Sequence, residues 1–336
     1  MSHKTFTYGE AIREGFRYLL AEHPEVFAIG QGLWSPWYVG SSMTDLEKEF
    51  GKARVIDSPI SELACTGAAV GASLCGYRPI VIHPRMDFML LATDQLVNQA
   101  AKWSYMFAGQ AHPKVTIRGI VNRGGEQGAQ HSQALHSMFA HIPGLRVVMP
   151  ATVADARDLL IASVLCDDPV LYIDDRWLYE QTAALPAVKE LCLSDVQPQK
   201  LVKGEAFTLV ASSFSTQLCL DALTLLRKDN ITGDLIDLRV INPLNVDAIV
   251  ESVRQTGRLC VVDGSWANCG LAGEIIASVV ERVEPSTLKT KPVRITLPDA
   301  PAPTSKSLEA VYYPKATQVA QQIVALVRSE VCEASV

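Results

Sequence analysis

The chain has 336 residues, and its 30 Lys and Arg stand against 36 Asp and Glu, so its formal net charge is −6. Hydrophobic residues make up 48% and charged residues 20%, a globular composition that excludes a disordered or collagen-like chain. The mild acidity argues against nucleic acid or an anionic membrane surface as the main partner. The sequence also holds no uncharged apolar run of about 18 residues, the length that would span a membrane.

The cysteines and the first residues predict a cytoplasmic protein. The 8 cysteines are scattered and form no CxxC pair, which is typical of buried, reduced thiols rather than of a disulfide framework. The segment MSHKTFTYGEAIREGF lacks the apolar core of a secretory signal and is interpreted as an amphipathic start.

Apolar runs and helix-like stretches alternate through the first half of the chain. Strands are predicted at 26–30, 79–83, 114–120, 146–149 and 169–174, and helices at 61–76, 88–106, 132–141 and 153–165. The strands are rich in Val and Ile with little polar alternation, as expected of strands that are covered on both faces. This order predicts a mainly parallel sheet with helices on both sides.

The alternation stops at 183–203, which holds two prolines and no clear strand, and it starts again afterwards. Strands are predicted at 206–212, 233–240, 258–263 and 292–297, helices at 215–228, 246–256, 270–282 and 316–328, and a frayed tail after Arg328. A chain of this length usually splits into two cores. We therefore expect an α/β protein with two doubly wound domains, at 1–185 and 204–336, joined by a linker at 186–203.

All 7 histidines lie at or before residue 141, so acid–base chemistry is expected in the first domain. His131, His136 and His141 are spaced by five, which puts them on different sides of a helix, and no Cys or carboxylate cluster completes a metal site. We therefore predict no metal-ligating residues. The glycine-rich stretch 119–128 lacks both common phosphate-loop patterns and is interpreted as a loop that brings His131 to a pocket.

Glu62 opens the predicted helix at 61–76, and two interpretations of it stay open. Ser58 or Ser61 would cap the helix, and an acid in the first turn is favourable there for electrostatic reasons alone. Alternatively, Glu62 is a carboxylate held at a strand-to-helix crevice, where open α/β sheets bind ligands. The local sequence does not choose between these two.

Several ordered segments carry a resemblance to a known family. They read VIDSPISELACTGAAVGASLCGYRPIVIH, DQLVNQAAKWSYMF, GAQHSQALHSMFAHIPGLRVVMPAT, IDLRVINPLNVDAIVESV, RLCVVDGSWANCGLAGEI and LPDAPAPTSKSLEAVYYP. The chain resembles the β subunit of the thiamine-diphosphate-dependent first component of 2-oxo acid dehydrogenases, found in pyruvate, branched-chain and acetoin complexes. The resemblance implies a transketolase-like pyrimidine-binding domain followed by a transketolase-type C-terminal domain that serves dimer contact and docking.

The resemblance assigns roles to three residues. Glu62 matches the glutamate that contacts N1′ of the cofactor's aminopyrimidine and promotes loss of the proton from its thiazolium carbon. Phe88 matches the aromatic residue that stacks on the pyrimidine, although by itself it would be interpreted as core packing. His131 matches the active-site histidine of AQHSQ, a candidate for proton transfer or for receiving the acyl acceptor.

A missing motif is equally informative. Thiamine enzymes hold the diphosphate through Mg²⁺ with a GDG motif followed by Asn, and the chain contains no GDG. The resemblance therefore implies half a cofactor site, completed by an α subunit that carries the diphosphate and Mg²⁺ motif in an α2β2 assembly with β–β contacts. A lipoyl acyltransferase core is a further partner in complexes of this family.

The chain departs from the family at three places. Many members read EFMTFNF where this chain has residues 82–88 (IHPRMDF), so His83 and Arg85 are candidates to bind substrate, and Arg85 suits a carboxylate or phosphate. The alternative is that Arg85 only contacts solvent or a partner chain. Gln31-Gly32 replaces a Glu pair of many members. The loop at 166–169 looks one residue short where some relatives bind a monovalent cation, so binding of K⁺ is left open.

We therefore predict a β subunit that works with an α partner and thiamine diphosphate. It decarboxylates a 2-oxo acid and transfers the acyl unit to a lipoyl group. The altered turn at 82–87 also fits a two-chain carboligase or transketolase-like enzyme without a lipoyl acceptor. A non-catalytic scaffold subunit is a third hypothesis, against which the joint presence of Glu62, Phe88 and His131 argues.

Overall fold

A computed structural model describes residues 4–329 of the chain. The described residues form two compact units, and three stretches make up the first: 4–123, Gln130–Val196 and Val240–Pro243. The second holds Gly124–Ala129, Gln197–Arg239 and 244–329. The tail from residue 330, including Cys332, lies outside the described residues, so the frayed end expected there is not tested.

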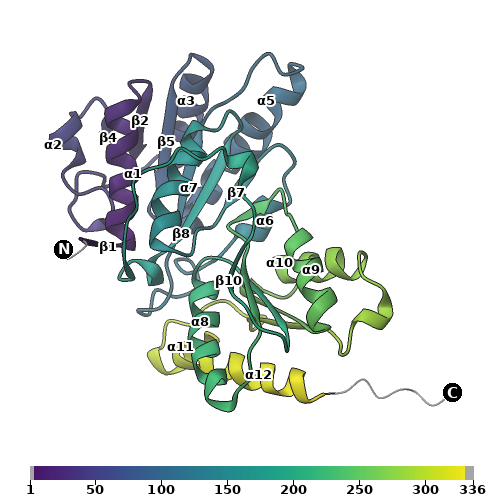
Figure 1. The fold of residues 1–336 in the computed structure, drawn as a ribbon. Coiled ribbons are helices and arrows are strands. Elements are labelled where there is room, and N and C mark those ends of the chain that lie inside the picture. Colours follow the sequence, from purple (N-terminus) through teal and green to yellow (C-terminus); the bar gives the residue numbers. More distant parts are fainter. Residues whose placement is uncertain (1–3, 330–336) are drawn as a thin grey trace. The chain divides into compact units, whose positions relative to one another are not determined.

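The first unit is built on a seven-stranded sheet in the order β13-β7-β8-β6-β5-β2-β4 (Figure 1). All neighbours from β7 to β4 pair in parallel, and only the edge strand β13 is antiparallel to its neighbour β7. The strands of this sheet are β2 (Val26–Gly30), β4 (Val55–Asp57), β5 (Arg78–His83), β6 (Thr116–Val121), β7 (Arg146–Val148), β8 (Val170–Asp175) and β13 (Val240–Asn242). Three short strands lie outside it: β1 (Thr5–Thr7), β3 (Tyr38–Ser41) and β9 (Thr182–Ala184).

Helices cover both faces of this sheet, as expected of a mainly parallel sheet whose strands are joined by crossover connections. α1 and α7 pack side by side over one face, whereas α3 contacts β5 and the segment 86–106 (Figure 1). The helices are α1 (Tyr8–Glu22), α2 (Leu46–Phe50), α3 (Glu62–Leu74), α4 (Met86–Met89), α5 (Ala101–Met106), α6 (His136–Ala140) and α7 (Val153–Leu165).

Local sequence explains where α1 and α7, which pack against each other, begin. Thr7 accepts a hydrogen bond from the backbone N–H of Glu10, and the Glu10 carboxylate accepts one from the backbone N–H of Thr7, which forms a capping box at α1. Thr152 caps α7 through the backbone N–H of Asp155. Capping hydrogen bonds therefore fix the start of both helices.

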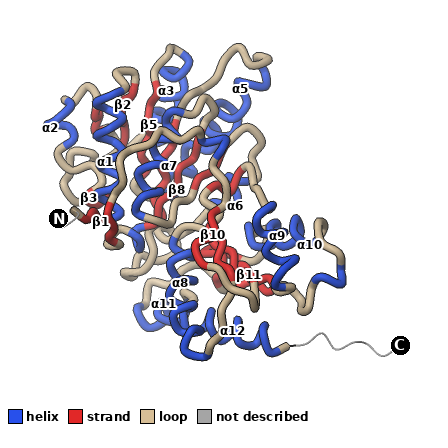
Figure 2. Tube along the Cα trace, in the orientation of Figure 1, coloured by secondary structure: helices blue, strands red, loops and turns tan. Residues whose placement is uncertain are grey.

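The second unit has a five-stranded sheet in the order β10-β12-β11-β14-β15, with only β10 antiparallel (Figure 2). Its strands are β10 (Gln199–Val202), β11 (Thr208–Ala211), β12 (Asp234–Asp237), β14 (Leu259–Trp266) and β15 (Val293–Leu297). Its helices are α8 (Phe214–Leu226), α9 (Asp247–Thr256), α10 (Leu271–Val280), α11 (Lys306–Tyr312) and α12 (Ala316–Arg328). α8 packs against α12, and Phe207, Leu223 and Ile323 lie in their common core, each at most 3% exposed.

The predicted alternation of strands and helices is confirmed in both halves, with four corrections. The predicted helix at 132–141 is shorter, because only His136–Ala140 is helical. The stretch 183–203 does contain strands, because β9 pairs with β1 and β10 pairs with β12. The predicted strand at 233–240 ends at Asp237, and Val240 starts the separate strand β13. The predicted helix at 88–106 is broken into α4, a 3₁₀ turn at Leu90–Ala92, a π-helical stretch at Gln95–Ala100 and α5.

Candidate functional site

The predicted site residues lie on the loops that follow neighbouring parallel strands of the first unit. Glu62 follows β4, His83 ends β5, Arg85 and Phe88 come directly after β5, and His131 follows β6. Strands β6, β5, β2 and β4 are consecutive in the sheet. Ligands of open α/β sheets bind outside the carboxyl ends of the strands, so this edge is the candidate site.

Glu62 is the first residue of α3 and is buried, with 7% of its surface exposed. Its Oε1 accepts a hydrogen bond of 3.1 Å from Nε2 of Gln31, which follows β2. The positive end of a 13-residue helix stabilises a carboxylate at this position. Ser61 stands directly before the helix, but its side chain makes no capping hydrogen bond, so the cap predicted for it is wrong.

His83 lies beneath Glu62 with only 3% of its surface exposed. Burial lowers the pKa of its imidazole to about 4, because the charged form loses its hydration, and attraction to the Glu62 carboxylate opposes this shift. Its Nε2 shares a hydrogen bond of 3.3 Å with Oγ1 of Thr66 on α3. His83 is therefore a neutral group that joins β5 to the helix carrying Glu62.

Phe88 and His131 meet directly. Their ring centroids are 5.2 Å apart and the planes cross at 86°, an edge-to-face contact. Phe88 is 39% exposed, which is unusual for a large aromatic side chain and leaves ring surface free for a ligand. The contact brings together two residues that are 43 positions apart (131 − 88) in the sequence.

Arg85 stands at the position before α4, and its Nη1 is buried with no hydrogen-bond partner among residues 4–329. A buried guanidinium nitrogen without an acceptor is costly. The backbone N–H of Phe88 donates to the carbonyl oxygen of Arg85 at 3.2 Å, but the structure gives no hydrogen bond from the Arg85 side chain to the other candidate residues. An anionic acceptor supplied from outside this chain would satisfy it.

Three residues near the site had no role assigned from the sequence: Gln31, Asp87 and Gln133. Gln31 donates the hydrogen bond to Glu62 and lies in the turn after β2. The backbone N–H of the next residue, Gly32, donates to Oδ1 of Asp57 at 2.7 Å and holds this turn in place. Asp87 accepts two hydrogen bonds from Gln133. The sequence signal available for Asp87 was an acid directly before the candidate residue Phe88.

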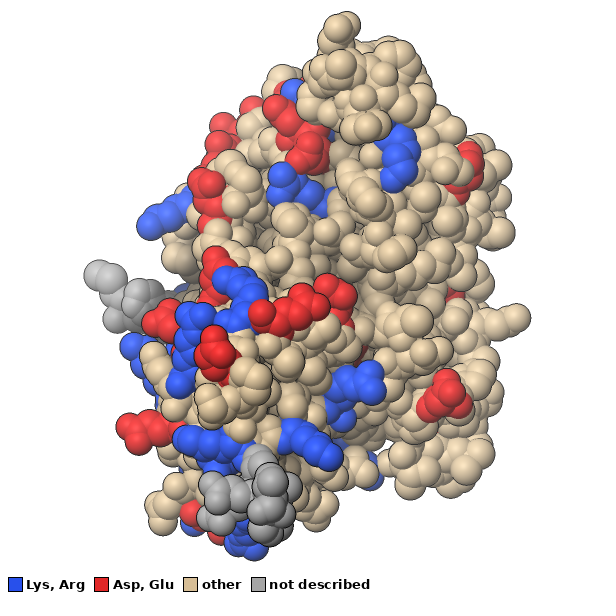
Figure 3. Space-filling model, turned by 90° about the vertical axis from the view of Figure 1, so that its right-hand side faces the viewer, with Lys and Arg blue, Asp and Glu red and all other residues tan. Residues whose placement is uncertain are grey.

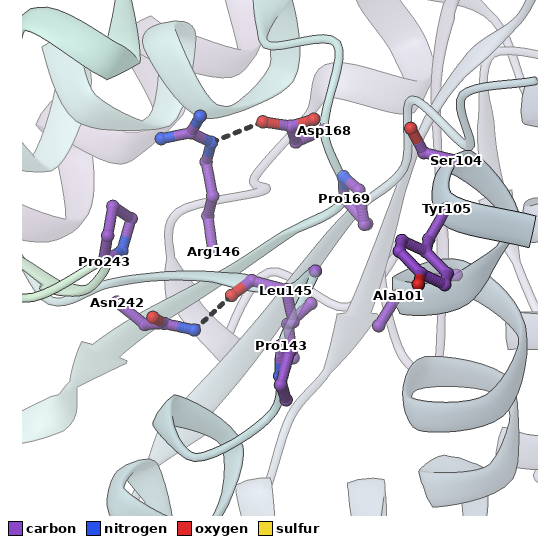
Figure 4. A pocket seen from close by; sticks show the side chains of 12 residues that line it. Ala101, Ser104, Tyr105, Pro143, Leu145, Arg146, Asp168, Pro169, Asn242 and Pro243 are labelled. Carbon is purple, nitrogen blue, oxygen red and sulfur yellow. Dashed lines mark hydrogen bonds and ion pairs between the residues drawn. The ribbon is translucent and has the colours of Figure 1, made fainter. Parts of the chain in front are cut away.

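A pocket of about 390 Å³ lies elsewhere in the first unit, where β7 and β8 begin, and it contains none of the predicted site residues (Figure 4). Arg146 Nε and Asp168 Oδ2 form an ion pair of 2.7 Å at one side of it, and the Asn242 amide donates to the Leu145 carbonyl. Because it lies at the amino ends of the strands, we do not assign the chemistry to it.

Surface charges, metal ligands and membrane-spanning helices were also considered for residues 4–329. On the face drawn in Figure 3, basic and acidic side chains are interspersed, in keeping with their near-equal numbers. Within residues 4–329 no group of three or more His, Cys, Asp or Glu is placed to hold a metal ion. No helix in that range is long and apolar enough to cross a membrane.

Comparison with known proteins identifies the class. The chain matches the family models "Transketolase, pyrimidine binding domain" at residues 4–181 and "Transketolase, C-terminal domain" at residues 197–319. A solved structure described as "Split gene transketolase, inactive beta4 tetramer" superposes with a TM-score of 0.74 at 21% identity, covering 96% of this chain and 98% of that one. The fold is thus transketolase-like, as predicted.

Curated relatives define the family more closely. The chain is 36% identical to the acetoin:2,6-dichlorophenolindophenol oxidoreductase subunit beta of Cupriavidus necator, over 92% of this chain and 94% of the relative. It is 34% identical to a pyruvate dehydrogenase E1 component subunit beta of Rickettsia felis, over 94% and 97%. The mitochondrial counterpart from Rattus norvegicus is 35% identical, over 90% and 85%. The chain belongs to the family of β subunits of the thiamine-diphosphate-dependent first component of 2-oxo acid dehydrogenases.

Proposed function

We propose that this chain supplies the pyrimidine half of a thiamine diphosphate site and acts with an α subunit. Together they decarboxylate a 2-oxo acid and transfer the acyl unit to a lipoyl group. The observation that carries the proposal is the buried Glu62 carboxylate at the start of α3, on the same sheet edge as the Phe88–His131 pair. The cytoplasmic location expected from the sequence is part of the proposal.

The residues of this edge fit the pyrimidine end of the cofactor. Bound thiamine diphosphate supplies the nucleophile and the electron sink for decarboxylation of a 2-oxo acid. Glu62 would share a proton with the ring, because a buried carboxylate at a helix start is held in place with one oxygen already bonded to Gln31. Phe88 would stack on the ring with its exposed surface, and His131 would carry a proton to or from the reacting groups.

The α subunit is the partner that this half-site needs. The described residues hold no cluster for a metal ion, and Mg²⁺ takes oxygen ligands together with phosphate oxygens. We infer that the diphosphate and Mg²⁺ are held by the α subunit. An α2β2 assembly with β–β contacts, and docking to a lipoyl acyltransferase core, complete the proposed arrangement.

The contacts of Arg78 support the proposal that the loop at 166–169 binds no K⁺. Arg78 Nη1 donates to the carbonyl oxygens of Val164 and Cys166 at 2.9 and 2.8 Å, and its Nη2 donates to Oδ1 of Asp167 at 2.8 Å. Lys114 Nζ lies 2.7 Å from the same carboxylate oxygen. Because a guanidinium already occupies the carbonyl oxygens, we propose that the chain works without a monovalent cation.

Substitution of Glu62 tests the proposed function. In the complex with the α subunit, Glu62→Gln keeps the side-chain shape but removes the carboxylate, so turnover should fall about 100-fold or more with assembly intact. Glu274→Gln is the matched control, because Glu274 also lies in the first turn of a helix, α10 of the second unit. Decarboxylation measures the effect, and gel filtration checks assembly. Full activity of Glu62→Gln would leave the scaffold hypothesis standing.

A two-chain carboligase without a lipoyl acceptor is the second candidate function. The observation that favours it is the unpartnered Nη1 of Arg85 beside the altered turn, which suits a substrate with an additional anionic group. The complex is supplied with a 2-oxo acid and either a lipoyl domain or an aldehyde. Acylation of the lipoyl domain supports the first function, and an acyloin product supports the second.

A further inference from the structure

Between Arg123 and Gln133 the chain makes an excursion: it leaves the first unit and then returns to it. Contacts made by the returning chain must therefore fix its position. Residues 124–129 belong to the second unit, whereas Arg123 and the residues from Gln130 on belong to the first. Within the excursion, four residues have positive φ: Gly124 (69°), Gly125 (68°), Glu126 (62°) and Gly128 (74°). Glycine-rich backbone loses much conformational entropy when it is ordered. The position of His131 therefore depends on what holds the returning chain.

The departing chain has its own anchors. Nε of Arg123 donates to Oδ2 of Asp175 on β8 at 2.6 Å, and both side chains are buried. The amide of Asn122 donates to the carbonyl oxygen of Pro84 at 3.0 Å, which ties the end of β6 to the turn after β5. These contacts fix the chain up to Arg123 but not after the excursion.

The returning chain is held by Asp87. Oδ1 of Asp87 accepts the backbone N–H of Gln133 at 3.1 Å and the Nε2 amide of the same residue at 3.0 Å. Asp87 itself sits on α4, whose Met86 and Met89 are fully buried and give it a rigid base. The next residue on that helix is Phe88, whose ring meets His131 edge to face.

Asp87 is a buried carboxylate that contacts the returning chain through one oxygen. It is 5% exposed, and its Oδ2 is buried with no hydrogen-bond partner among the described residues. Burial raises the pKa of its carboxyl group, and the hydrogen bonds from Gln133 and the attraction of His131 offset part of that shift. Both hydrogen bonds to Gln133 end on Oδ1, so a neutral side chain with one oxygen acceptor at this position would make the same two bonds.

We propose that Asp87 is a positioning residue that clamps Gln133 and thereby sets His131 against Phe88. The clamp connects the helix that carries the stacking aromatic ring to the segment that carries the histidine. Misplacement of a reacting group by about 1 Å can cost about 100-fold in rate, so loss of the clamp acts on the chemical step and not on the binding of the 2-oxo acid. The inference rests on the proposed function for its kinetic readout.

The test uses three variants of the chain, each assembled with the α subunit. Asp87→Ala should lower kcat about 10-fold or more and change KM for the 2-oxo acid by less than about two-fold. Asp87→Asn should keep most of the turnover, because its amide oxygen accepts the same two hydrogen bonds. Gln133→Ala should fall between them, and the double variant Asp87→Ala/Gln133→Ala should be no slower than Asp87→Ala alone.

A control and a second readout separate the possible failures. Asp234 is a buried carboxylate of the second unit that accepts the backbone N–H of Gly204 and the hydroxyl of Ser252, so Asp234→Ala should lower the unfolding temperature and leave kcat unchanged. Hydrogen exchange of the 130–135 segment follows the clamp without activity, because the Gln133 N–H is one of its bonds. Exchange should speed up in Asp87→Ala but not in Asp87→Asn.

The outcomes are distinguishable. A wild-type complex that turns over no 2-oxo acid contradicts the proposed function, and the exchange data then decide the clamp alone. An active wild type with equal kcat in Asp87→Ala, or with unchanged exchange in that variant, overturns the inference and leaves the proposed function intact. Equal losses in Asp87→Ala and Asp87→Asn also overturn it, because the hydrogen bonds would not be what matters.

Discussion

At the scale of single residues, the site is a set of polar groups whose state depends on burial. Glu62 and His83 are both buried, and Oε1 of Glu62 accepts a hydrogen bond from Gln31, whereas His83 is almost completely enclosed. The imidazole therefore stays neutral under ordinary conditions, with its pKa lowered to about 4 by burial. A neutral His83 therefore forms no ion pair with Glu62.

The lowered pKa of His83 predicts a pH dependence of stability. Between about pH 6.5 and about pH 4 the unfolded chain binds a proton that the folded chain does not. The free energy of unfolding should therefore fall as the pH drops through this range, by up to about 3 kcal/mol. Denaturant unfolding of the wild type and of His83→Gln measures the effect, and the variant should lose this part of the pH dependence.

The control for this prediction is His141→Gln, because His141 is exposed. This variant should follow the wild-type curve. A pH dependence of the same size in His83→Gln and wild type would show that the buried imidazole is not its source.

At the scale of elements, the sequence predicts what is locally encoded. Strands such as β5 and β8 are runs of apolar residues, and α7 begins at its capping Thr152, so each is visible in a short window. β10 and β13 were missed because no short window of sequence shows them. β10 pairs with β12 and β13 pairs with β7, and each partner is far away in the sequence. β13 also starts only three positions after the end of β12, so the two strands were predicted as one. Their strand conformation comes from those pairings and not from their own composition.

The residues of the candidate site also divide into those that the local sequence shows and those that only the folded chain brings together. Glu62 and His131 were predicted through the family resemblance because each lies in a recognisable motif, whereas Phe88 was predicted by its position in a segment that otherwise departs from the family pattern. The roles of Gln31, Asp87 and Gln133 depend on hydrogen bonds between separate loops. No spacing rule connects such residues, and only the folded sheet edge brings them together.

The loop after α7 gives a prediction at the same scale. Because Arg78 occupies the carbonyl oxygens of Val164 and Cys166, the unfolding temperature of the wild type should be the same in KCl and in choline chloride at equal ionic strength. Arg78→Ala opens these oxygens beside Asp167. It should unfold a few degrees earlier, and KCl should recover part of that loss.

Arg146→Ala is the matched control for this loop. Arg146 pairs with Asp168 at 2.7 Å but donates to none of these carbonyl oxygens, so KCl should not recover its stability. A wild-type unfolding temperature that rises in KCl relative to choline chloride would contradict the assignment of Arg78 as the built-in cation.

At the scale of the whole molecule, the chain is one part of an enzyme. It carries the pyrimidine-binding and C-terminal domains of a transketolase-like protein and belongs to a family of β subunits. In the proposed function the polar residues of its first unit bind one end of thiamine diphosphate and the α subunit binds the other. On this proposal, activity is expected only in the complex with the α subunit.

Calorimetric titration of thiamine diphosphate with Mg²⁺ tests this account most directly. The titration is made into the chain alone, into the α subunit alone and into their mixture. The account predicts tight binding in the mixture and at most weak binding to either chain by itself. Equally tight binding to this chain alone would contradict it, because the chain would then contain a complete diphosphate site and the two-chain arrangement would be wrong.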